Sequence, residues 1–247
     1  MLLKNKNIVV CGGSGLIGKD LVKGIINSGG NAIIADLQDP EWRKFNSSSF
    51  ILTDFNSPES VESLVNECQE NFKKIDGLII SIYPRNKNYG KHFQNLEYAD
   101  FIENVGLHLG GYFSALKYFL TLFKSQGHGN IINVSSIYGS FTPSFEIYNG
   151  TSMTVPIEYI CAKSAIESMT KYLAKLYKQN NIRINNISPG GILDNQDPIF
   201  LENYNSRCAS KGMLDSIDLV GSAIFLLSDM SEFINGQNII IDDGFTL

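Results

Sequence analysis

The chain has 247 residues, of which 43% are hydrophobic and 18% charged, and its formal net charge at pH 7 is −5. These values are typical of a globular protein with a sizeable core, and the negative charge argues against a nucleic-acid partner, because phosphate backbones favour basic surfaces. The four cysteines show no zinc or disulfide spacing, and no apolar run approaches the roughly 18 residues that span a bilayer. We expect reduced thiols, no metal, no membrane span and a cytoplasmic location.

Apolar runs that predict strands alternate along the chain with segments of helical spacing. The expected strands are residues 7–11, 32–35, 50–52, 77–82, 130–134, 183–187 and 238–241. The expected helices are residues 16–28, 57 to about 72, 98–124, 156–179 and about 217–228. Continuous apolar strands separated by helices are typical of a parallel sheet buried on both faces. We therefore expect an α/β fold, a doubly wound Rossmann sheet of about seven strands in a single domain, residues 1–247.

Two long stretches, residues 83–97 and 137–155, show neither helical nor strand periodicity. Each follows the carboxyl end of an expected strand, which is the edge where doubly wound sheets bind ligands. Long loops in a compact domain are usually functional. We therefore expect both stretches to shape a binding site.

The first expected strand is joined to the first helix by a glycine-rich segment. Gly12, Gly15 and Gly18 recur every three residues. Glycine permits a tight turn and lets backbone amides approach a pyrophosphate, and the helix N-terminus adds partial positive charge. A simple turn is the alternative reading, but the position between a strand and a helix favours dinucleotide binding. The expected cofactor contacts here are Gly12, Ser14, Gly15, Leu16, Ile17 and Gly18.

Two aspartates follow the second and third expected strands. Asp36 can accept hydrogen bonds from both ribose hydroxyls of an adenosine and would repel a 2′-phosphate. No lysine or arginine lies in the glycine loop or directly after Asp36, so we expect NAD(H) in preference to NADP(H). Asp54 could hold the adenine amino group. Aspartates that only cap turns are the alternative for both positions.

Tyr159 and Lys163 lie four residues apart in an expected helix, and therefore on one face of it. A fixed ammonium favours phenolate, so we expect Lys163 to lower the pKa of Tyr159 from its usual value of about 10. Such a phenol could donate and accept protons near neutral pH. Ser136 precedes Tyr159 by 23 residues, after the fifth expected strand.

These features together resemble the short-chain dehydrogenase/reductase family over nearly the whole chain. The resemblance rests on the glycine motif, Asn133-Val-Ser-Ser136, the Tyr159/Lys163 pair, Ser188-Pro-Gly190 and the segment from Gly236 to Asp243. It implies that Tyr159 exchanges a proton with the substrate oxygen, that Lys163 lowers its pKa and binds the nicotinamide ribose, and that Ser136 hydrogen-bonds the reacting oxygen. It also implies that Pro189, Gly190 and Ile192 border the nicotinamide.

The chain departs from the family pattern at three places. The glycine spacing resembles that of the extended branch, but the longer C-terminal substrate domain of that branch is missing. Ser81-Ile-Tyr83 replaces the usual Asn-Ala-Gly, which packs near the adenosine in relatives. His108 stands where relatives have an asparagine that holds a relay water. Because histidine titrates near neutrality, we hypothesise that His108 keeps this relay. A buried structural histidine is the alternative.

The two long loops carry the expected substrate contacts. Residues 83–90 are basic and aromatic, and Arg85 and Lys87 would suit a phosphate or carboxylate. Tyr148 and Asn149 in the second loop would suit sugar hydroxyls. A solvated charged loop is the alternative. These segments also resemble a subgroup of the family that is associated with surface-glycan and nonulosonic acid biosynthesis.

We expect an NAD(H)-dependent oxidoreductase that interconverts a secondary alcohol and a ketone on a small-molecule sugar derivative. An epimerase or dehydratase that recycles tightly bound NAD, and a non-catalytic NAD-binding protein, are the alternatives. By analogy with relatives we expect a homodimer or homotetramer built through residues 98–124 and 156–179.

Overall fold

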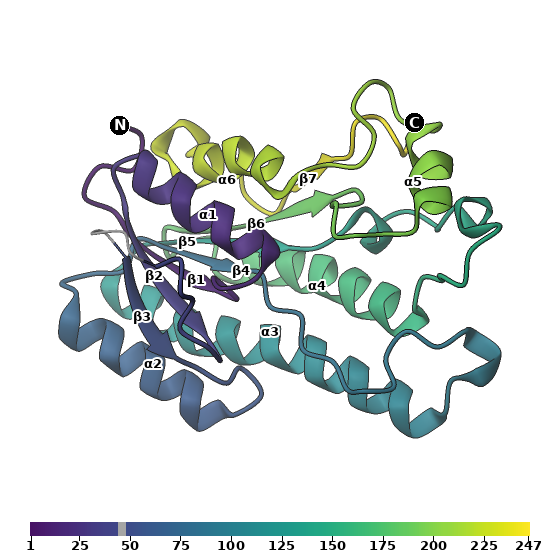
Figure 1. The fold of residues 1–247 in the computed structure, drawn as a ribbon. Helices are drawn as coiled ribbons and strands as arrows, with labels where there is room; N and C mark the ends of the chain where they lie inside the picture. The colour runs from purple at the N-terminus through teal and green to yellow at the C-terminus, as the bar shows by residue number, and fades with distance from the viewer. Residues whose placement is uncertain (44–47) are drawn as a thin grey trace.

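The computed structural model describes residues 1–43 and 48–247, and these build one parallel sheet (Figure 1). Its strands are β1 (Asn7–Cys11), β2 (Asn31–Asp36), β3 (Ser48–Leu52), β4 (Gly77–Ile80), β5 (Gly129–Val134), β6 (Ile182–Pro189) and β7 (Asn238–Ile241). Their order in the sheet is β3-β2-β1-β4-β5-β6-β7, and every neighbouring pair is parallel. The expected doubly wound fold is confirmed.

Helices cover both faces of this sheet. The described α-helices are α1 (Leu16–Asn27), α2 (Pro58–Asn71), α3 (Tyr98–Gln126), α4 (Ile157–Leu176), α5 (Pro198–Asn205) and α6 (Val220–Leu227). α1 and α6 pack together on one face, while α2, α3 and α4 cover the other (Figure 1). Among the described residues, no helix has the length and apolar character needed to cross a lipid bilayer.

The core has two halves because consecutive strand residues point to opposite faces of the sheet. Val9 and Ile33 pack into the half under α2, α3 and α4, whereas their neighbours Val10 and Ile34 pack into the half under α1 and α6. All four side chains are fully buried. Each such burial stabilises the fold by about 1.5–3 kcal/mol.

The direction of chain progression reverses between β1 and β4, which pair in the middle of the sheet with Cys11 opposite Ile80. The loops that leave these two strands therefore diverge at the carboxyl edge, and a crevice opens between them. Tyr112 of α3 is buried beside this point, and its hydroxyl can donate to Ile80 O at 3.0 Å and to Val134 O at 2.7 Å. The ends of β4 and β5 are thereby linked.

One helix was not expected from the sequence. α5 has only eight residues and lies in a segment without sustained periodicity. Its start signal is nevertheless present: Asp197 accepts a hydrogen bond from Ile199 N at 2.8 Å, and Pro198 takes the first helical position. The expected helix near residues 217–228 divides into a 3₁₀ turn, Ser216–Leu219, followed by α6.

Candidate active site

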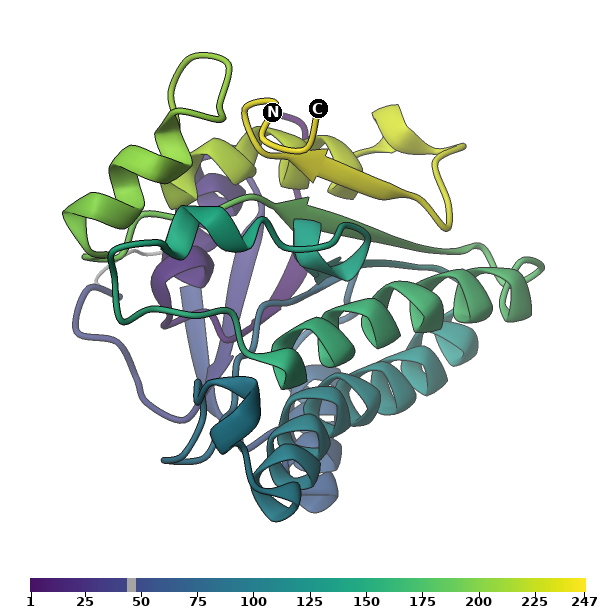
Figure 2. The same ribbon diagram turned by 90° about the vertical axis from the view of Figure 1, so that its right-hand side faces the viewer.

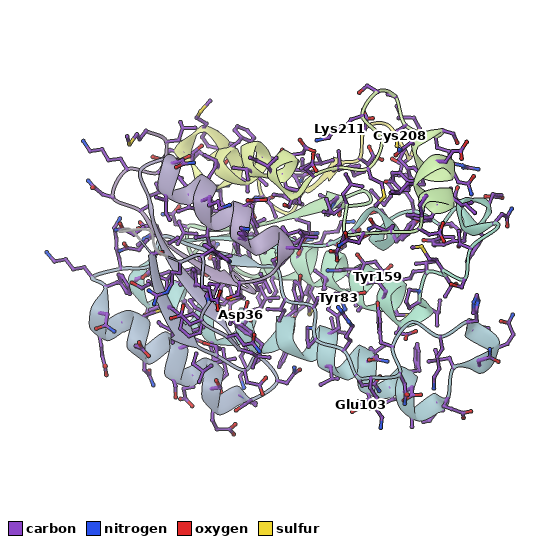
Figure 3. The ribbon with its side chains drawn as sticks, in the orientation of Figure 1. Asp36, Tyr83, Glu103, Tyr159, Cys208 and Lys211 are labelled. Carbon is purple, nitrogen blue, oxygen red and sulfur yellow. The ribbon has the colours of Figure 1, made fainter. Side chains whose placement is uncertain are left out.

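A cavity of about 900 Å³ lies along the carboxyl edge of the sheet. Its walls come from the glycine loop, from the residues after β2, β4, β5 and β6, and from the first turns of α4. α5, which lies on the right in Figure 1, and residues between β5 and α4 close the far end. Asp36 lies apart from Tyr83 and Tyr159 along this edge in Figure 3. The cavity is large enough for an extended cofactor together with a small substrate.

The glycine loop has a geometry that side chains would not allow. Gly12 has a φ of +77°, and a Cβ on it would lie 2.6 Å from Ser81 O. A Cβ on Gly18 would lie 2.0 Å from Gly12 O, so α1 packs directly onto the loop. Gly15 caps α1 without a side-chain hydrogen bond, and Leu16 and Ile17 line the cavity. The amides of the first turn have no partner within the helix, so this end of the cavity fits a pyrophosphate.

Asp36 lies at the end of β2, and it lines the cavity. Its carboxylate accepts hydrogen bonds from Ser14 N at 2.9 Å and from Leu37 N at 2.7 Å. Asp54 also lines the cavity, and it accepts from Asn56 N at 2.9 Å. Ser14 does not line the cavity, and its hydroxyl donates to Gln38 O at 2.8 Å. Its backbone amide instead holds the Asp36 carboxylate in place.

Ser136, Tyr159 and Lys163 converge at the end of β5. Ser136 is buried, accepts a hydrogen bond from Tyr138 N at 3.2 Å and is hydrogen-bonded to the Tyr159 side chain. Lys163 is buried; its Nζ donates to Val134 O at 2.8 Å and lies 5.5 Å from the centroid of the Tyr159 ring. All three residues line the cavity.

The expected effect of Lys163 on Tyr159 is wrong for this structure. Burial raises the pKa of Tyr159 well above its usual value, and the Ser136 hydrogen bond opposes this shift. Burial also lowers the pKa of Lys163 to about 7, against a smaller raising effect of Glu167. The sequence reveals the spacing of the pair but not its desolvation, and here desolvation is the larger effect.

His108 lies behind the tyrosine rather than in the cavity wall. It is buried in α3, with its ring centroid 6.1 Å from that of Tyr159 and 5.1 Å from that of Tyr83. Its Nε2 has no hydrogen-bond partner among the described residues. Burial, followed by the charges of Lys163 and Arg85, holds the pKa of His108 well below its usual value. The expectation that it titrates near neutrality is therefore wrong, and the ring is neutral at pH 7.

The predicted substrate contacts divide into two groups. Arg85 and Tyr148 line the cavity, and the Arg85 guanidinium carbon lies 4.7 Å from the centroid of the Tyr83 ring. Lys87 and Asn149 are exposed and do not line the cavity. Residues 83–97 and 137–155 show no periodicity, so the sequence could not indicate which of their side chains face the cavity.

Pro189 at the end of β6, and Gly190 and Ile192 directly after it, line the cavity. A Cβ on Gly190 would lie 2.6 Å from the Tyr204 hydroxyl, so the backbone here packs against that side chain. The Tyr204 hydroxyl accepts a hydrogen bond from Gly191 N at 2.7 Å. The turn after β6 is therefore fixed from the side of α5.

Of the wall at the far end of the cavity, only Tyr148 was expected from the sequence. This aromatic wall comprises Tyr138, Tyr148, Phe200, Tyr204 and Met213, which pack together and line the cavity. Phe200 and Tyr204 lie on α5, and because that helix was not predicted, neither residue was expected in the site. The regular spacing of Phe200 and Tyr204, one helical turn apart after Asp197-Pro198, was the available signal.

No group of histidine, cysteine or acidic side chains in residues 1–43 and 48–247 has the arrangement of a metal site. Among the described cavity-lining residues, the cationic side chains are Arg85 and Lys163. Arg85 makes no ion pair with a described residue, whereas Lys163 is bound to a backbone carbonyl.

Comparisons with known proteins agree with this geometry. A family model described as enoyl-(acyl carrier protein) reductase matches residues 14–246. The chain is 43% identical to post-translational flagellin modification protein A of Campylobacter coli, over all of both chains. It is 28% identical to a 7alpha-hydroxysteroid dehydrogenase of Bacteroides fragilis, over 99% of this chain and 95% of that one. A short chain dehydrogenase structure from Leptospira borgpetersenii with bound NAD+ superposes with a TM-score of 0.89 at 33% identity, covering 99% and 94% of the two chains.

Proposed function

Because the chain belongs to the short-chain dehydrogenase/reductase family, we propose that it is an NAD(H)-dependent enzyme that interconverts a secondary alcohol and a ketone on a sugar or sugar phosphate. The observation that carries this proposal is that one cavity holds both sets of residues. The glycine loop and Asp36 line it together with Ser136, Tyr159 and Lys163. A binding protein without chemistry would not need this buried trio.

The cofactor end of the proposal rests on charge. The first turn of α1 offers amides to a pyrophosphate, and Asp36 offers a carboxylate where a ribose would lie. Neither Arg85 nor Lys163, the described cations of the cavity wall, lies on the glycine loop or β2. A 2′-phosphate would therefore meet a carboxylate without a compensating cation, which favours NAD(H) over NADP(H). The relative of known structure with bound NAD+ supports this choice.

The nicotinamide, when bound, supplies or accepts the hydride. In the reductive direction the Tyr159 hydroxyl gives its proton to the carbonyl oxygen, and in the oxidative direction its phenolate accepts the alcohol proton. The Ser136 hydroxyl hydrogen-bonds the same oxygen and holds it beside Tyr159. Protonated Lys163 favours the phenolate that remains after proton donation, but this attraction is smaller than the effect of burial, which keeps the pKa of Tyr159 raised. Because burial raises the pKa of Tyr159, its phenol is protonated near neutral pH, which is the form that acts as donor in the reductive direction.

The substrate end combines one cation with an aromatic wall. Arg85 is the described cavity cation without an ion pair, and a guanidinium suits a phosphate or carboxylate group. The wall that includes Tyr148 and Tyr204 offers flat faces and hydroxyls of the kind that pack against sugar rings. A relative named for flagellin modification supports a substrate in surface-glycan biosynthesis.

A screen of phosphorylated, aminated and acidic sugars tests the proposal, with formation of NADH from NAD+ as the readout. We expect NADH to accumulate with one class of sugar and the rate with NADP+ to be at least tenfold lower. Tyr159→Phe should lower kcat by a factor of about 10² to 10⁴ and leave NAD+ binding in place. A sugar that is converted without net NADH would instead indicate an epimerase or dehydratase, and absence of NAD+ binding would refute the proposal.

A further inference from the structure

Glu167 is a buried carboxylate that does not line the cavity, although it lies one helical turn after Lys163 on α4. Three serine hydroxyls point at it. Ser135 lies 3.2 Å from Oε1, Ser188 lies 3.2 Å from the same atom, and Ser140 donates to Oε2 at 2.5 Å. A buried carboxylate is costly unless it is hydrogen-bonded in this way, so these contacts stabilise it.

The three serines belong to the segments that carry the proposed active-site groups. Ser135 directly precedes Ser136, and Ser140 follows the 3₁₀ turn Ile137–Gly139 that Ser136 caps. Ser188 directly precedes Pro189 in β6. Glu167 therefore joins α4, the Ser136 segment and the end of β6 through side-chain contacts alone.

Asn238 of β7 contacts two of these serines. The Ser188 hydroxyl can donate to Asn238 Oδ1 at 2.7 Å, and Asn238 Nδ2 donates to the Ser140 hydroxyl at 3.2 Å. The Ser188 hydroxyl has one proton, so it donates either to Asn238 Oδ1 or to Glu167 Oε1, and the four side chains form a network rather than a closed ring. Each of its links fixes one segment relative to the next.

Gly139 shows how closely these segments approach each other. A Cβ there would lie 2.3 Å from Glu167 Oε1 and 2.9 Å from Ser135 Oγ. The Ser164 hydroxyl of α4 also donates to Gly139 O at 2.8 Å. The Ser136 segment can therefore rest against α4 only with glycine at this position.

We propose that Glu167 is a positioning residue of the active site, whose hydrogen bonds fix the Ser136 segment and the Pro189 segment against the helix that carries Lys163. This inference rests on the proposed function for its effect on catalysis. Glu167 touches neither the cavity nor the Tyr159 hydroxyl in this arrangement, so it acts through the groups that it holds.

The same carboxylate also contributes charge. Lys163 is faced by Tyr159 and Glu167 of its own helix, by His108 and Tyr112 of α3, and by the carbonyl of Val134 in β5. His108 is neutral at pH 7, and the tyrosine pKa values lie above their usual range. Glu167 is therefore the anion that favours protonated Lys163, and its negative charge raises the pKa of Lys163.

The test measures Lys163 directly, without a substrate, by NMR titration of the protein labelled with carbon-13 at the lysine Cε. We expect Lys163 to titrate near pH 7 in the unaltered chain. In Glu167→Gln the midpoint should fall by about one unit, because a charge one helical turn away has been removed. Glu167→Asp, which restores the charge, should recover at least half of that shift. Identical midpoints in the folded Gln variant and the unaltered chain would overturn the charge role.

Catalysis is measured in parallel on the sugar found in the screen, with NAD+ binding followed separately. Glu167→Gln should lower kcat at pH 7 at least tenfold, change KM less than threefold and keep NAD+ affinity within threefold. Asp76→Asn is the matched control, since Asp76 is a partly buried carboxylate before the amino end of β4, away from the cavity. It should lower stability without moving kcat or the Lys163 midpoint.

Two hydroxyl variants cover the case in which Glu167→Gln fails to fold. Ser140→Ala and Ser188→Ala each remove one donor and keep the carboxylate, and each should lower kcat at least threefold with unchanged NAD+ affinity. Unchanged kcat in both would refute the positioning role. Failure of the proposed function would look different: the unaltered chain itself would then not bind NAD+ or oxidise any sugar, whatever Lys163 does.

Discussion

Lys163 illustrates how burial can outweigh a neighbouring charge at a single residue. Its ammonium has one backbone acceptor, Val134 O, and its pKa falls to about 7 because the group is removed from water. The pattern Tyr-x-x-x-Lys revealed which side chains meet, since helical spacing fixes that from sequence. It could not reveal how the neighbouring elements exclude water, because α3 and β5 reach this point from distant parts of the chain.

The depressed pKa of Lys163 predicts a pH-dependent change in stability. Below pH 7 the buried ammonium is charged, and it lowers the free energy of unfolding by its full amount. Between pH 7 and the usual lysine value of about 10.5, the unfolded chain binds a proton that the folded chain lacks, so this destabilisation disappears as the pH rises through the window. Lys163→Met should therefore raise the free energy of unfolding at pH 6, by about 1–4 kcal/mol. Denaturant unfolding at pH 6 and pH 9 measures this, and an equal gain at both pH values would contradict the prediction.

The Asp36 carboxylate leads to a prediction about cofactor choice. Asp36→Ala removes the group that would repel a 2′-phosphate and that would hold a ribose, while it also frees Ser14 N and Leu37 N. We expect the ratio of kcat/KM for NAD+ to that for NADP+ to fall at least tenfold. Asp39→Asn is a suitable control, because Asp39 is exposed, pairs with Arg43 and does not line the cavity. A ratio that stays the same in Asp36→Ala would show that cofactor choice lies elsewhere.

At the scale of elements, the regular strands and long helices were predictable because their apolar residues repeat at fixed intervals. Both ends of β1 were predicted correctly, and the predicted end of α3 lies two residues before the observed one. α5 escaped because eight residues give too little periodicity. Lys87 and Asn149 show the same limit within loops: composition indicates a binding surface, whereas the inward or outward direction of each side chain depends on tertiary packing.

The junction between β1 and α1 gives a prediction for an element rather than for one side chain. In Gly18→Ala the added methyl would meet Gly12 O at 2.0 Å, so α1 must move away from the loop. We expect NAD+ affinity to fall at least tenfold, measured by calorimetry.

Gly106→Ala provides the matched control for that methyl group. Gly106 lies within α3, and a Cβ there meets nothing within 4 Å. The variant should bind NAD+ normally and gain about 0.5–1 kcal/mol of stability, because alanine favours a helix. Normal NAD+ binding by Gly18→Ala would mean that the loop adapts more than its packing indicates.

At the scale of the whole molecule, α3 and α4 lie side by side along one flank (Figure 2). Large apolar side chains on them remain exposed: Phe113 at 56%, Tyr172 at 68% and Leu176 at 58%. Large exposed apolar side chains on neighbouring helices favour association between copies of a chain. The predicted homodimer or homotetramer through these helices is consistent with that surface, and it remains a prediction.

Light scattering can test this assembly. The unaltered chain should show a mass two or four times that of the 27.4 kDa monomer. Phe113→Glu and Tyr172→Glu together should shift the mass toward one chain, because charges would then have to be buried at the contact. Phe233→Glu is the control, as that side chain is 92% exposed and lies outside both helices. A monomeric unaltered chain would exclude this mode of assembly.

The last strand of the sheet has a consequence for the order in which the molecule matures during translation. Tyr159 and Lys163 leave the ribosome long before Asn238, which contacts Ser140 and Ser188 from the edge strand β7. A nascent chain that ends before β7 would therefore carry every proposed reactive side chain while the Ser140 and Ser188 hydroxyls still lacked their bridge. Catalytic activity would then develop late in folding, once Asn238 is in place, although the Asn238 side chain takes no part in the chemistry.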